Sequence, residues 1–239
     1  MSGKKKMLQM FKRALALVGA RMSAHRLHQF QMVVNYMKLG QWMAANDFHT
    51  EKRVLNRHAV FAAVAEQVCD RKVLYLEFGV FKGASMRYWS SVLKHSEAIL
   101  HGFDSFEGLP EDFDVGGPYV KSTFDVGGEI PHIEDVRVQF FKGWFDEVLP
   151  TYQLPEHEVL IIVMDADLYS STIYVLNYLR PYIKQDTFIY FDNMSRPDHE
   201  PRAFAEFIKE SGLQFRLVSA DYSLNTAFFQ CVNGPQCSS

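Results

Sequence analysis

Residues 73–85 read Val-Leu-Tyr-Leu-Glu-Phe-Gly-Val-Phe-Lys-Gly-Ala-Ser, and this stretch decides the fold that we predict. Five of its first six residues are apolar or aromatic, with Glu77 as the exception, and such a short run is typical of a buried strand. Gly79 and Gly83 then allow a tight turn and a close approach of the backbone to a ligand. The N–H groups of the helix that follows can receive an anion, and Glu77 can accept from a ligand ammonium group. Phe81 stands at the middle glycine of a dinucleotide motif, which disfavours a nucleotide-cofactor oxidoreductase.

Outward from this stretch, short apolar runs alternate with helical patterns, which predicts a mainly parallel sheet covered on both faces. The strand candidates are 73–78, 99–103, 136–141, 159–164, 187–191, 213–218 and 226–232. Helical patterns lie between several of them, at 84–93, 171–179 and 201–211. The last two strands are close in sequence and are expected to pair as an antiparallel hairpin at one edge. We therefore predict an α/β fold with a seven-stranded sheet.

Residues 1–70 differ from the remainder, residues 71–239, and are predicted to be helical. Apolar side chains recur at three- and four-residue steps in 7–18, 27–43 and 54–68, with Gly19 and Gly40 as expected breaks. We expect this region to cover the site or to build a homo-oligomer.

Charge is unevenly distributed along the chain. Its net charge is −3, yet the first 46 residues hold eight Lys or Arg and no acid, which leaves the remainder with 17 basic and 28 acidic side chains. Such a basic arm can pack on the acidic domain of its own or a sister chain, or contact a membrane surface. No nucleic-acid partner is expected. Three cysteines without paired spacing favour a reducing cytoplasm, and no apolar run approaches a membrane span.

Asp104 follows the second strand, about 25 residues after the glycine turn. An acid at this place can accept hydrogen bonds from a ribose hydroxyl pair. The turn and the acid together predict a cofactor that contains adenosine. Gly143-Trp144-Phe145, after the third strand, offers aromatic faces on which adenine can stack, with core packing as the alternative.

Oxygen donors end the next two parallel strands. Asp165 follows one, and Asp192 and Asn193 follow the other. Adjacent strand ends lie about 4.8 Å apart, so the three side chains can surround one ion, and oxygen ligands suit Mg²⁺, Ca²⁺ or Mn²⁺. The alternative is that these residues cap helices and turns, and for Asp167 we expect a cap of the following helix.

Residues from about 73 to 232 resemble the macrocin-type sugar O-methyltransferases, class I enzymes that use S-adenosylmethionine (SAM) in natural-product biosynthesis. The matching stretches are 77–85, 104–110 (Asp-Ser-Phe-Glu-Gly-Leu-Pro), 143–150 and 165–172. More distantly, residues 76–85 are similar to the cofactor loop of catechol O-methyltransferases. The resemblance implies a Rossmann-like class I methyltransferase fold.

The same resemblance assigns roles to residues of this sequence. It implies that SAM is surrounded by Glu77, Gly79, Gly83 and Ser85 at its methionine part, by Asp104 at its ribose, and by Ser105, Phe106, Gly143, Trp144 and Phe145 near its adenosine. It also implies Mg²⁺ at Asp165, Asp192 and the following residue. Here the sequence departs, because the macrocin-type enzymes usually carry Asp where Asn193 stands, whereas the catechol-type enzymes carry Asp-Asn. Leu168 occupies the place of the catechol-type lysine base.

The predicted reaction is methyl transfer from SAM to a hydroxyl of a small molecule, a sugar or a glycosylated natural product. Asp165 is the predicted base as well as a metal ligand, with Asp167, His132 and His199 as weaker candidates. Residues 116–128 are expected to form a flap over the acceptor. The alternatives are a catechol- or phenol-directed methyltransferase and a catalytically silent SAM-fold binding protein.

Overall fold

The predicted strands assemble into one mixed sheet in the computed structural model, which describes residues 3–49, 52–113 and 120–233. The strand order is β1-β7-β8-β6-β5-β2-β3-β4, and β8 runs antiparallel to β6 and β7. The remaining pairings are parallel. The strands are β1 (Arg53–Val54), β2 (Val73–Phe78), β3 (Ile99–Asp104), β4 (Val138–Lys142), β5 (Val159–Met164), β6 (Phe188–Phe191), β7 (Phe215–Asp221) and β8 (Ala227–Cys231). The predicted fold class is confirmed.

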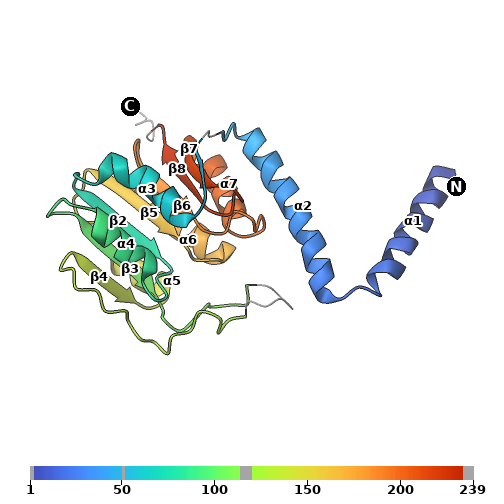
Figure 1. The fold of residues 1–239 in the computed structure, drawn as a ribbon, viewed down its shortest axis with the longest axis horizontal. Coiled ribbons are helices and arrows are strands. Elements are labelled where there is room, and N and C mark those ends of the chain that lie inside the picture. Colours follow the sequence, from blue (N-terminus) through green and yellow to red (C-terminus); the bar gives the residue numbers. More distant parts are fainter. Residues whose placement is uncertain (1–2, 50–51, 114–119, 234–239) are drawn as a thin grey trace.

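Helices cover both faces of this sheet (Figure 1). One face packs on α3 and α4, and the other on α6, α7 and the end of α2. The α-helices are α1 (Gly3–Gly19), α2 (Ala24–Ala45), α3 (Arg57–Val68), α4 (Ala84–Val92), α5 (Phe145–Val148), α6 (Tyr169–Leu179) and α7 (Glu200–Ser211). Two 3₁₀ turns, η1 (Leu149–Thr151) and η2 (Arg180–Tyr182), follow α5 and α6.

Alternation along β2 explains why the whole strand is buried. Tyr75 faces the core under α3 and α4, whereas Leu74 and Leu76 face the core under α6 and α7. Successive side chains of a strand point to opposite faces, so a strand covered on both faces is apolar at nearly every position, and in β2 Glu77 is the one exception. Strand order reverses at β2, between β5 and β3, and ligands bind beyond the carboxyl ends of strands at such a point.

Three sequence-based boundaries need correction. The sheet has eight strands rather than seven, because the two-residue strand β1 joins β7 and is too short to give a periodic pattern. Gly40 does not end a helix: α2 runs to Ala45, since the flanking Leu39 and Met43 are buried in the core and outweigh the roughly 1 kcal/mol cost of a helical glycine. Val136 lies outside β4 and is fully exposed.

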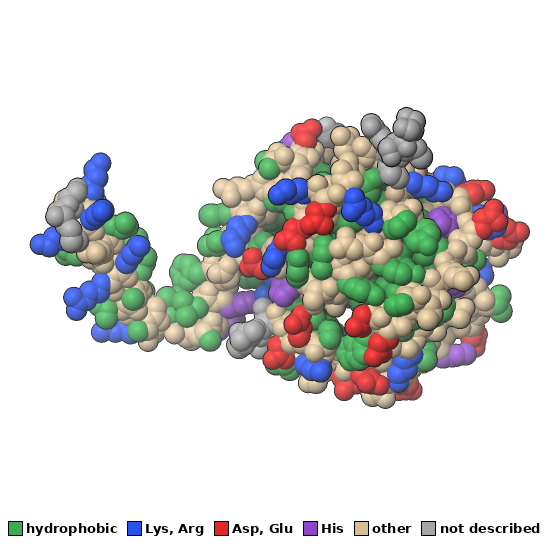
Figure 2. All heavy atoms as spheres, turned by 180° about the vertical axis from the view of Figure 1, so that it is seen from behind, with side chains coloured by type: hydrophobic (Ala, Val, Ile, Leu, Met, Phe, Trp, Pro, Cys, Tyr) green, Lys and Arg blue, Asp and Glu red, His purple; other side chains and the backbone are tan. Residues whose placement is uncertain are grey.

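The N-terminal helices extend away from the sheet (Figure 1). α1 has no buried residue, and its basic side chains lie on the projecting arm (Figure 2). α3 differs, because Val60, Phe61 and Val64 are buried against the sheet. The proposed division of the chain at residue 70 stays a prediction. Among the described helices, none combines the length and apolar character needed to cross a bilayer.

A buried histidine on β3 makes stability depend on pH. Burial lowers the pKa of His101 to about 4, and its Nδ1 lies 2.7 Å from the Tyr152 hydroxyl. Its ordinary pKa is 6.5, so below that pH the unfolded chain takes up a proton that the folded chain does not. Stability is therefore expected to fall as pH drops from about 6.5 to about 4, by about 2 kcal/mol between pH 8 and pH 5.

Urea unfolding of wild type and His101→Gln at pH 8 and pH 5 measures this effect. The variant is expected to lose about 2 kcal/mol less than wild type over that interval. His132→Gln is the control, because the His132 side chain is exposed and should leave the pH dependence as it is in wild type. Equal pH dependence in wild type and His101→Gln would show that His101 is not the group responsible.

Candidate active site

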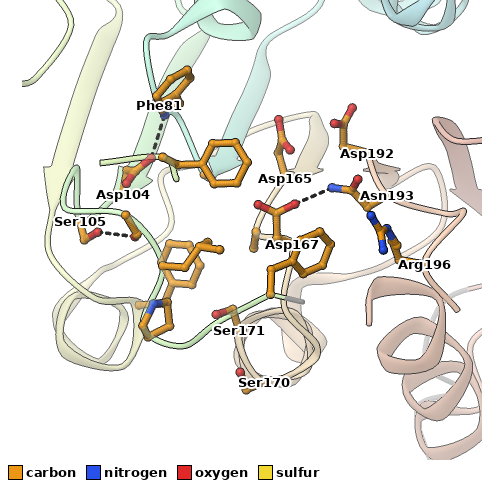
Figure 3. Close-up of a pocket in the computed structure, with 18 of the residues that line it drawn as sticks. Phe81, Asp104, Ser105, Asp165, Asp167, Ser170, Ser171, Asp192, Asn193 and Arg196 are labelled. Atoms are coloured by element: carbon orange, nitrogen blue, oxygen red, sulfur yellow. Dashed lines mark hydrogen bonds between the residues drawn. The ribbon is translucent and has the colours of Figure 1, made fainter. Parts of the chain in front are cut away.

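A cavity of about 1120 Å³ lies beyond the carboxyl ends of the central strands. One end is lined by the glycine turn after β2, by Asp104 and by residues 143–145, and the other by the acids that follow β5 and β6. Figure 3 shows Asp104 and Ser105 on one side of this space and Asp165, Asp167 and Asp192 on the other. Its volume exceeds that of a usual small-molecule pocket, so two ligands can be bound next to each other.

Gly79 brings the ends of β2 and β5 into contact. Its φ is +91°, and a Cβ at this position would lie 1.9 Å from the carbonyl oxygen of Asp165. Glycine is therefore required here by the neighbouring strand as well as by the turn. Gly83 caps the start of α4 with a φ of +72° and does not line the cavity.

Asp104 fixes the glycine turn through backbone hydrogen bonds. Its Oδ2 accepts from the N–H groups of Val80 (2.7 Å) and Phe81 (2.8 Å), and its Oδ1 accepts from Phe106 N–H (2.7 Å). A carboxylate offers about four acceptor sites, so one remains for a ligand hydroxyl. The residue thus shapes the loop around a ligand in addition to lining the cavity.

The other residues predicted around the cofactor divide into two groups. Ser105, Gly143, Trp144 and Phe145 line the cavity, and Phe145 also packs edge-on against Phe78, with ring centroids 5.5 Å apart. Glu77, Ser85 and Phe106 are buried and do not line it. Burial raises the pKa of Glu77 well above its usual value, and among the residues that the structure describes its Oε2 has no hydrogen-bond partner.

Asp165, Asp192 and Arg57 form the polar centre of the cavity end that lies beyond β5 and β6. Arg57, the first residue of α3, donates from Nη2 to Asp165 Oδ2 over 2.5 Å, and its Nε lies 3.4 Å from Asp192 Oδ1. The Tyr190 hydroxyl also donates to Asp192 Oδ1, over 2.6 Å. Burial and the charge of Asp192 raise the pKa of Asp165 to about 7, although Arg57 opposes the rise.

Asp167 and Asn193 pair with each other beside this centre (Figure 3). Asn193 Nδ2 donates to Asp167 Oδ1 over 2.7 Å, and burial raises the pKa of Asp167 to about 8. The expectation that Asp167 caps the following helix is wrong. The N-cap of α6 is Leu168, whose apolar side chain cannot make a capping bond, and the Asp167 carboxylate accepts from Asn193.

The predicted Mg²⁺ site does not fit this arrangement. The guanidinium of Arg57 already contacts both Asp165 and Asp192, and Asn193 presents its amide nitrogen to Asp167. Like unit charges 4 Å apart near a protein surface repel by about 4 kcal/mol, so a dication beside Arg57 is disfavoured. In the described part of the chain, no group of three His, Cys, Asp or Glu side chains is arranged to hold a metal.

The other candidate bases and the predicted flap are placed as follows. His132 is exposed and does not line the cavity. His199 does not line it either, and its ring lies 4.7 Å from that of Phe113. Within the predicted flap, 116–119 fall outside the described residues. The described part is bonded to the loop after β3, where Gly128 N–H donates to Phe106 over 2.7 Å.

A family model for macrocin O-methyltransferases (TylF) matches residues 41–230. The chain belongs to this family. The resemblance inferred from the glycine turn and from residues 104–110 is confirmed, and so is the enzyme class, a SAM-dependent O-methyltransferase, at the level of the family.

Two curated relatives are similar to part of this chain. Mycinamicin III 3''-O-methyltransferase of Micromonospora griseorubida is 25% identical over 191 residues, which are 71% of this chain and 73% of the relative. The 8-demethyl-8-(2,3-dimethoxy-alpha-L-rhamnosyl)-tetracenomycin-C 4'-O-methyltransferase of Streptomyces olivaceus is 29% identical over 143 residues, 49% of this chain. The chain spans about half the length (51%) of that second relative.

Solved structures show the same fold. The calicheamicin methyltransferase CalS11 superimposes with a TM-score of 0.59 at 24% identity, over 74% of this chain and 80% of CalS11. The O-methyltransferase NovP gives a TM-score of 0.52 at 22% identity, over 74% of this chain and 78% of NovP.

Asp104 is expected to control cofactor affinity in this TylF-family chain. In Asp104→Asn one carboxylate oxygen becomes an NH₂ group, which cannot accept from the loop N–H groups and carries no charge. Each charge-assisted hydrogen bond contributes about 1.5–3 kcal/mol, so S-adenosylhomocysteine should bind about 10- to 100-fold more weakly by calorimetry. Asp125→Asn is the control, since Asp125 accepts from Gly127 N–H in an exposed loop. Equal affinities of Asp104→Asn and wild type would refute this role.

Arg57 is a site residue that sequence reasoning missed. It lies 108 residues from Asp165, and no motif marks it. The local signal is limited to Asn56, whose side chain accepts from Ala59 N–H and starts α3 at this point.

Proposed function

We propose that this chain transfers a methyl group from SAM to a hydroxyl of a sugar, on a glycosylated natural product. The observation that carries the proposal is the continuous cavity, which joins the glycine-turn end to the acids after β5 and β6. Both relatives are named as O-methyltransferases, and the rhamnosyl-tetracenomycin C named as the substrate of one of them supports this choice of acceptor.

The proposed SAM site lies at the glycine-turn end. Asp104 would accept from the ribose, and Trp144 and Phe145 would contact the adenine. Their place on the cavity wall supports these roles. Gly79 and Gly83 would set the path of the backbone, and Glu77, Ser85 and Phe106 would act from behind it, because they do not line the cavity.

SAM supplies a methyl group activated on a sulfonium. Binding both reactants in one cavity replaces a bimolecular encounter. This can lower the activation free energy by about 7–11 kcal/mol. Asp165 would take the proton of the acceptor hydroxyl while the C–S bond breaks and the new C–O bond forms. The products are a methyl ether, S-adenosylhomocysteine and protonated Asp165. A base with a pKa of about 7 is well matched to this step near neutral pH.

The acceptor end favours a polyhydroxylated ligand over a flat aromatic one. Its wall includes Ser195, Asp221, Ser223 and Asn225, which offer hydroxyl, carboxylate and amide groups. A catechol-directed enzyme would need an apolar, planar slot at this place instead. The sequence-based alternative of a catechol acceptor is therefore less well supported.

The proposal is tested by measuring the release of S-adenosylhomocysteine with three kinds of acceptor. These are rhamnosylated macrolides, rhamnosylated aromatic polyketides and simple catechols. Turnover with a glycosylated acceptor and little with catechol is the expected result. Turnover with catechol alone would favour the catechol-type alternative. No release with any of these acceptors would favour a silent binding protein.

We further propose that α1 and the exposed part of α2 form an assembly surface for a second copy of this chain. Met10 and Phe11 on α1 and Phe30 and Met37 on α2 are exposed. The basic arm complements the net acidic remainder of the chain, which supports a sister chain as the partner. Light scattering measures the oligomeric state of wild type and of Phe11→Glu, and we expect an oligomer for wild type that is weakened in the variant. If wild type is a monomer and binds anionic vesicles, the predicted membrane contact is favoured instead. Location in the cytoplasm stays a prediction.

A further inference from the structure

A cation already lies between the two carboxylates at the ends of β5 and β6. The Arg57 guanidinium donates to Asp165 over 2.5 Å and lies 3.4 Å from Asp192. Both carboxylates are mostly buried, with 23% and 21% of their side-chain surface exposed. Two carboxylates this close and this poorly hydrated require a nearby positive charge.

The surroundings of Arg57 place its guanidinium at this position. Asn56 caps α3 and so sets where the helix, and Arg57 with it, begins. The guanidinium carbon lies 5.5 Å from the Phe61 ring centroid and 5.6 Å from that of Tyr190, which is cation–π distance. The side chain is 31% exposed and lines the cavity, so it faces the ligand space.

The ligand set is otherwise weaker than a Mg²⁺ site requires. Asn193 is neutral and donates to Asp167, so two carboxylates remain to hold a dication. When both are ionised, the carboxylates of Asp165 and Asp192 carry a charge of −2, and the Arg57 guanidinium reduces the net charge of the cluster to −1. Mg²⁺ prefers several oxygen ligands in an octahedral set and gives up water reluctantly.

We propose that Arg57 takes the place of the metal ion in this chain, so that methyl transfer proceeds without a divalent cation. This inference rests on the proposed function. Arg57 would act as a positioning residue: it holds the Asp165 carboxylate beside the acceptor hydroxyl and supplies the positive charge near the oxygen as the methyl group is transferred. A planar guanidinium can bond two carboxylates at once, which an ammonium group does less well.

Calorimetric titration of Mg²⁺ and Mn²⁺ into the full chain, saturated with S-adenosylhomocysteine, tests the cation assignment without any acceptor. We expect no saturable binding in wild type below about 10 mM, and binding at least about tenfold tighter in Arg57→Ala, where the two carboxylates are free to hold the ion. Arg53→Ala is the matched control, because Arg53 lies on the edge strand β1 and not in the cavity; it should behave like wild type. Saturable, stoichiometric Mg²⁺ binding by wild type at sub-millimolar concentration would overturn the proposal.

Methyl transfer with and without EDTA gives the second readout. The turnover rate of wild type should be unchanged by EDTA. The turnover rate of Arg57→Ala should be at least about 100-fold lower and should partly recover with Mg²⁺. Arg57→Lys should retain more activity than Arg57→Ala. If Arg57→Ala does not bind S-adenosylhomocysteine, Arg57→Gln, which also removes the charge, replaces it in both measurements. Loss of wild-type activity in EDTA would overturn the proposal. Absence of turnover with every acceptor, with calorimetry as expected, would count against the proposed function while supporting Arg57 as the resident cation.

Discussion

Replacing Asp165 with asparagine is expected to lower kcat for methyl transfer by about 100- to 10,000-fold, the usual contribution of a positioned general base. The amide keeps the shape of the side chain but cannot take the proton of the acceptor hydroxyl. Affinity for S-adenosylhomocysteine should change by less than about threefold, because Asp165 lies at the acceptor end of the cavity. Initial rates with the best glycosylated acceptor and calorimetry with S-adenosylhomocysteine measure the two quantities.

The pH profile provides a further readout for Asp165. Burial raises its pKa to about 7, and the base acts only when ionised. Wild-type kcat should therefore rise with pH through about 7 and then level off, and this step should be missing from the residual activity of Asp165→Asn. Activity that stays high in Asp165→Asn, or a profile that keeps the step, would assign the base to another group.

Asp167→Asn is the matched comparison. Asp167 is also buried, lines the same cavity and has a raised pKa of about 8. The substituted amide oxygen can still accept from Asn193 Nδ2, so its local hydrogen bond is kept. We expect a loss of about tenfold at most. A loss as large as that of Asp165→Asn would mean that the negative charge of the cluster, and not one base, limits the rate.

Replacing Gly79 with alanine is expected to abolish S-adenosylhomocysteine binding and to destabilise the fold. The new Cβ would lie 1.9 Å from the Asp165 carbonyl oxygen, and a φ of +91° is unfavourable for any residue with a Cβ. Overpacking typically costs about 1–3 kcal/mol and the left-handed backbone about 1–2 kcal/mol. Together they should lower Tm by about 5–15 °C in thermal unfolding.

Gly212→Ala separates the two contributions to that cost. Gly212 ends α7 with a φ of +70°, but nothing lies within 4 Å of the position that its Cβ would take. The loss of unfolding free energy in Gly212→Ala should be limited to the backbone contribution, about 1–2 kcal/mol, and S-adenosylhomocysteine binding should be unchanged. Equal destabilisation of the two variants would show that the contact between β2 and β5 can relax without cost.

Local sequence was sufficient for the elements that form the sheet. The apolar runs at 73–78 and 159–164 match β2 and β5 residue for residue. A strand buried on both faces is apolar at nearly every position, and this is visible in all six residues of β5 and in every residue of β2 except Glu77. The turn glycines and Asp104 were recognised because their spacing from the strand ends is local.

Elements without a local pattern were missed or misplaced. Strand β1 has two residues, and its assignment depends on pairing with β7. Gly40 was expected to end a helix, yet the burial of Leu39 and Met43 keeps α2 intact. Asp167 was expected to cap α6, whereas its partner is Asn193. In each case a partner distant in sequence determines the conformation.

By itself the sequence determined that this chain is an α/β protein with a glycine turn, an acid after the second strand and acids after two further strands. Only the tertiary structure decided that Arg57 lies against Asp165 and Asp192, where the sequence had suggested a metal ion. The physical reason is that helix and strand periodicity are properties of neighbouring residues. An ion pair between side chains 108 residues apart has no period and exists only after the sheet and α3 have packed together.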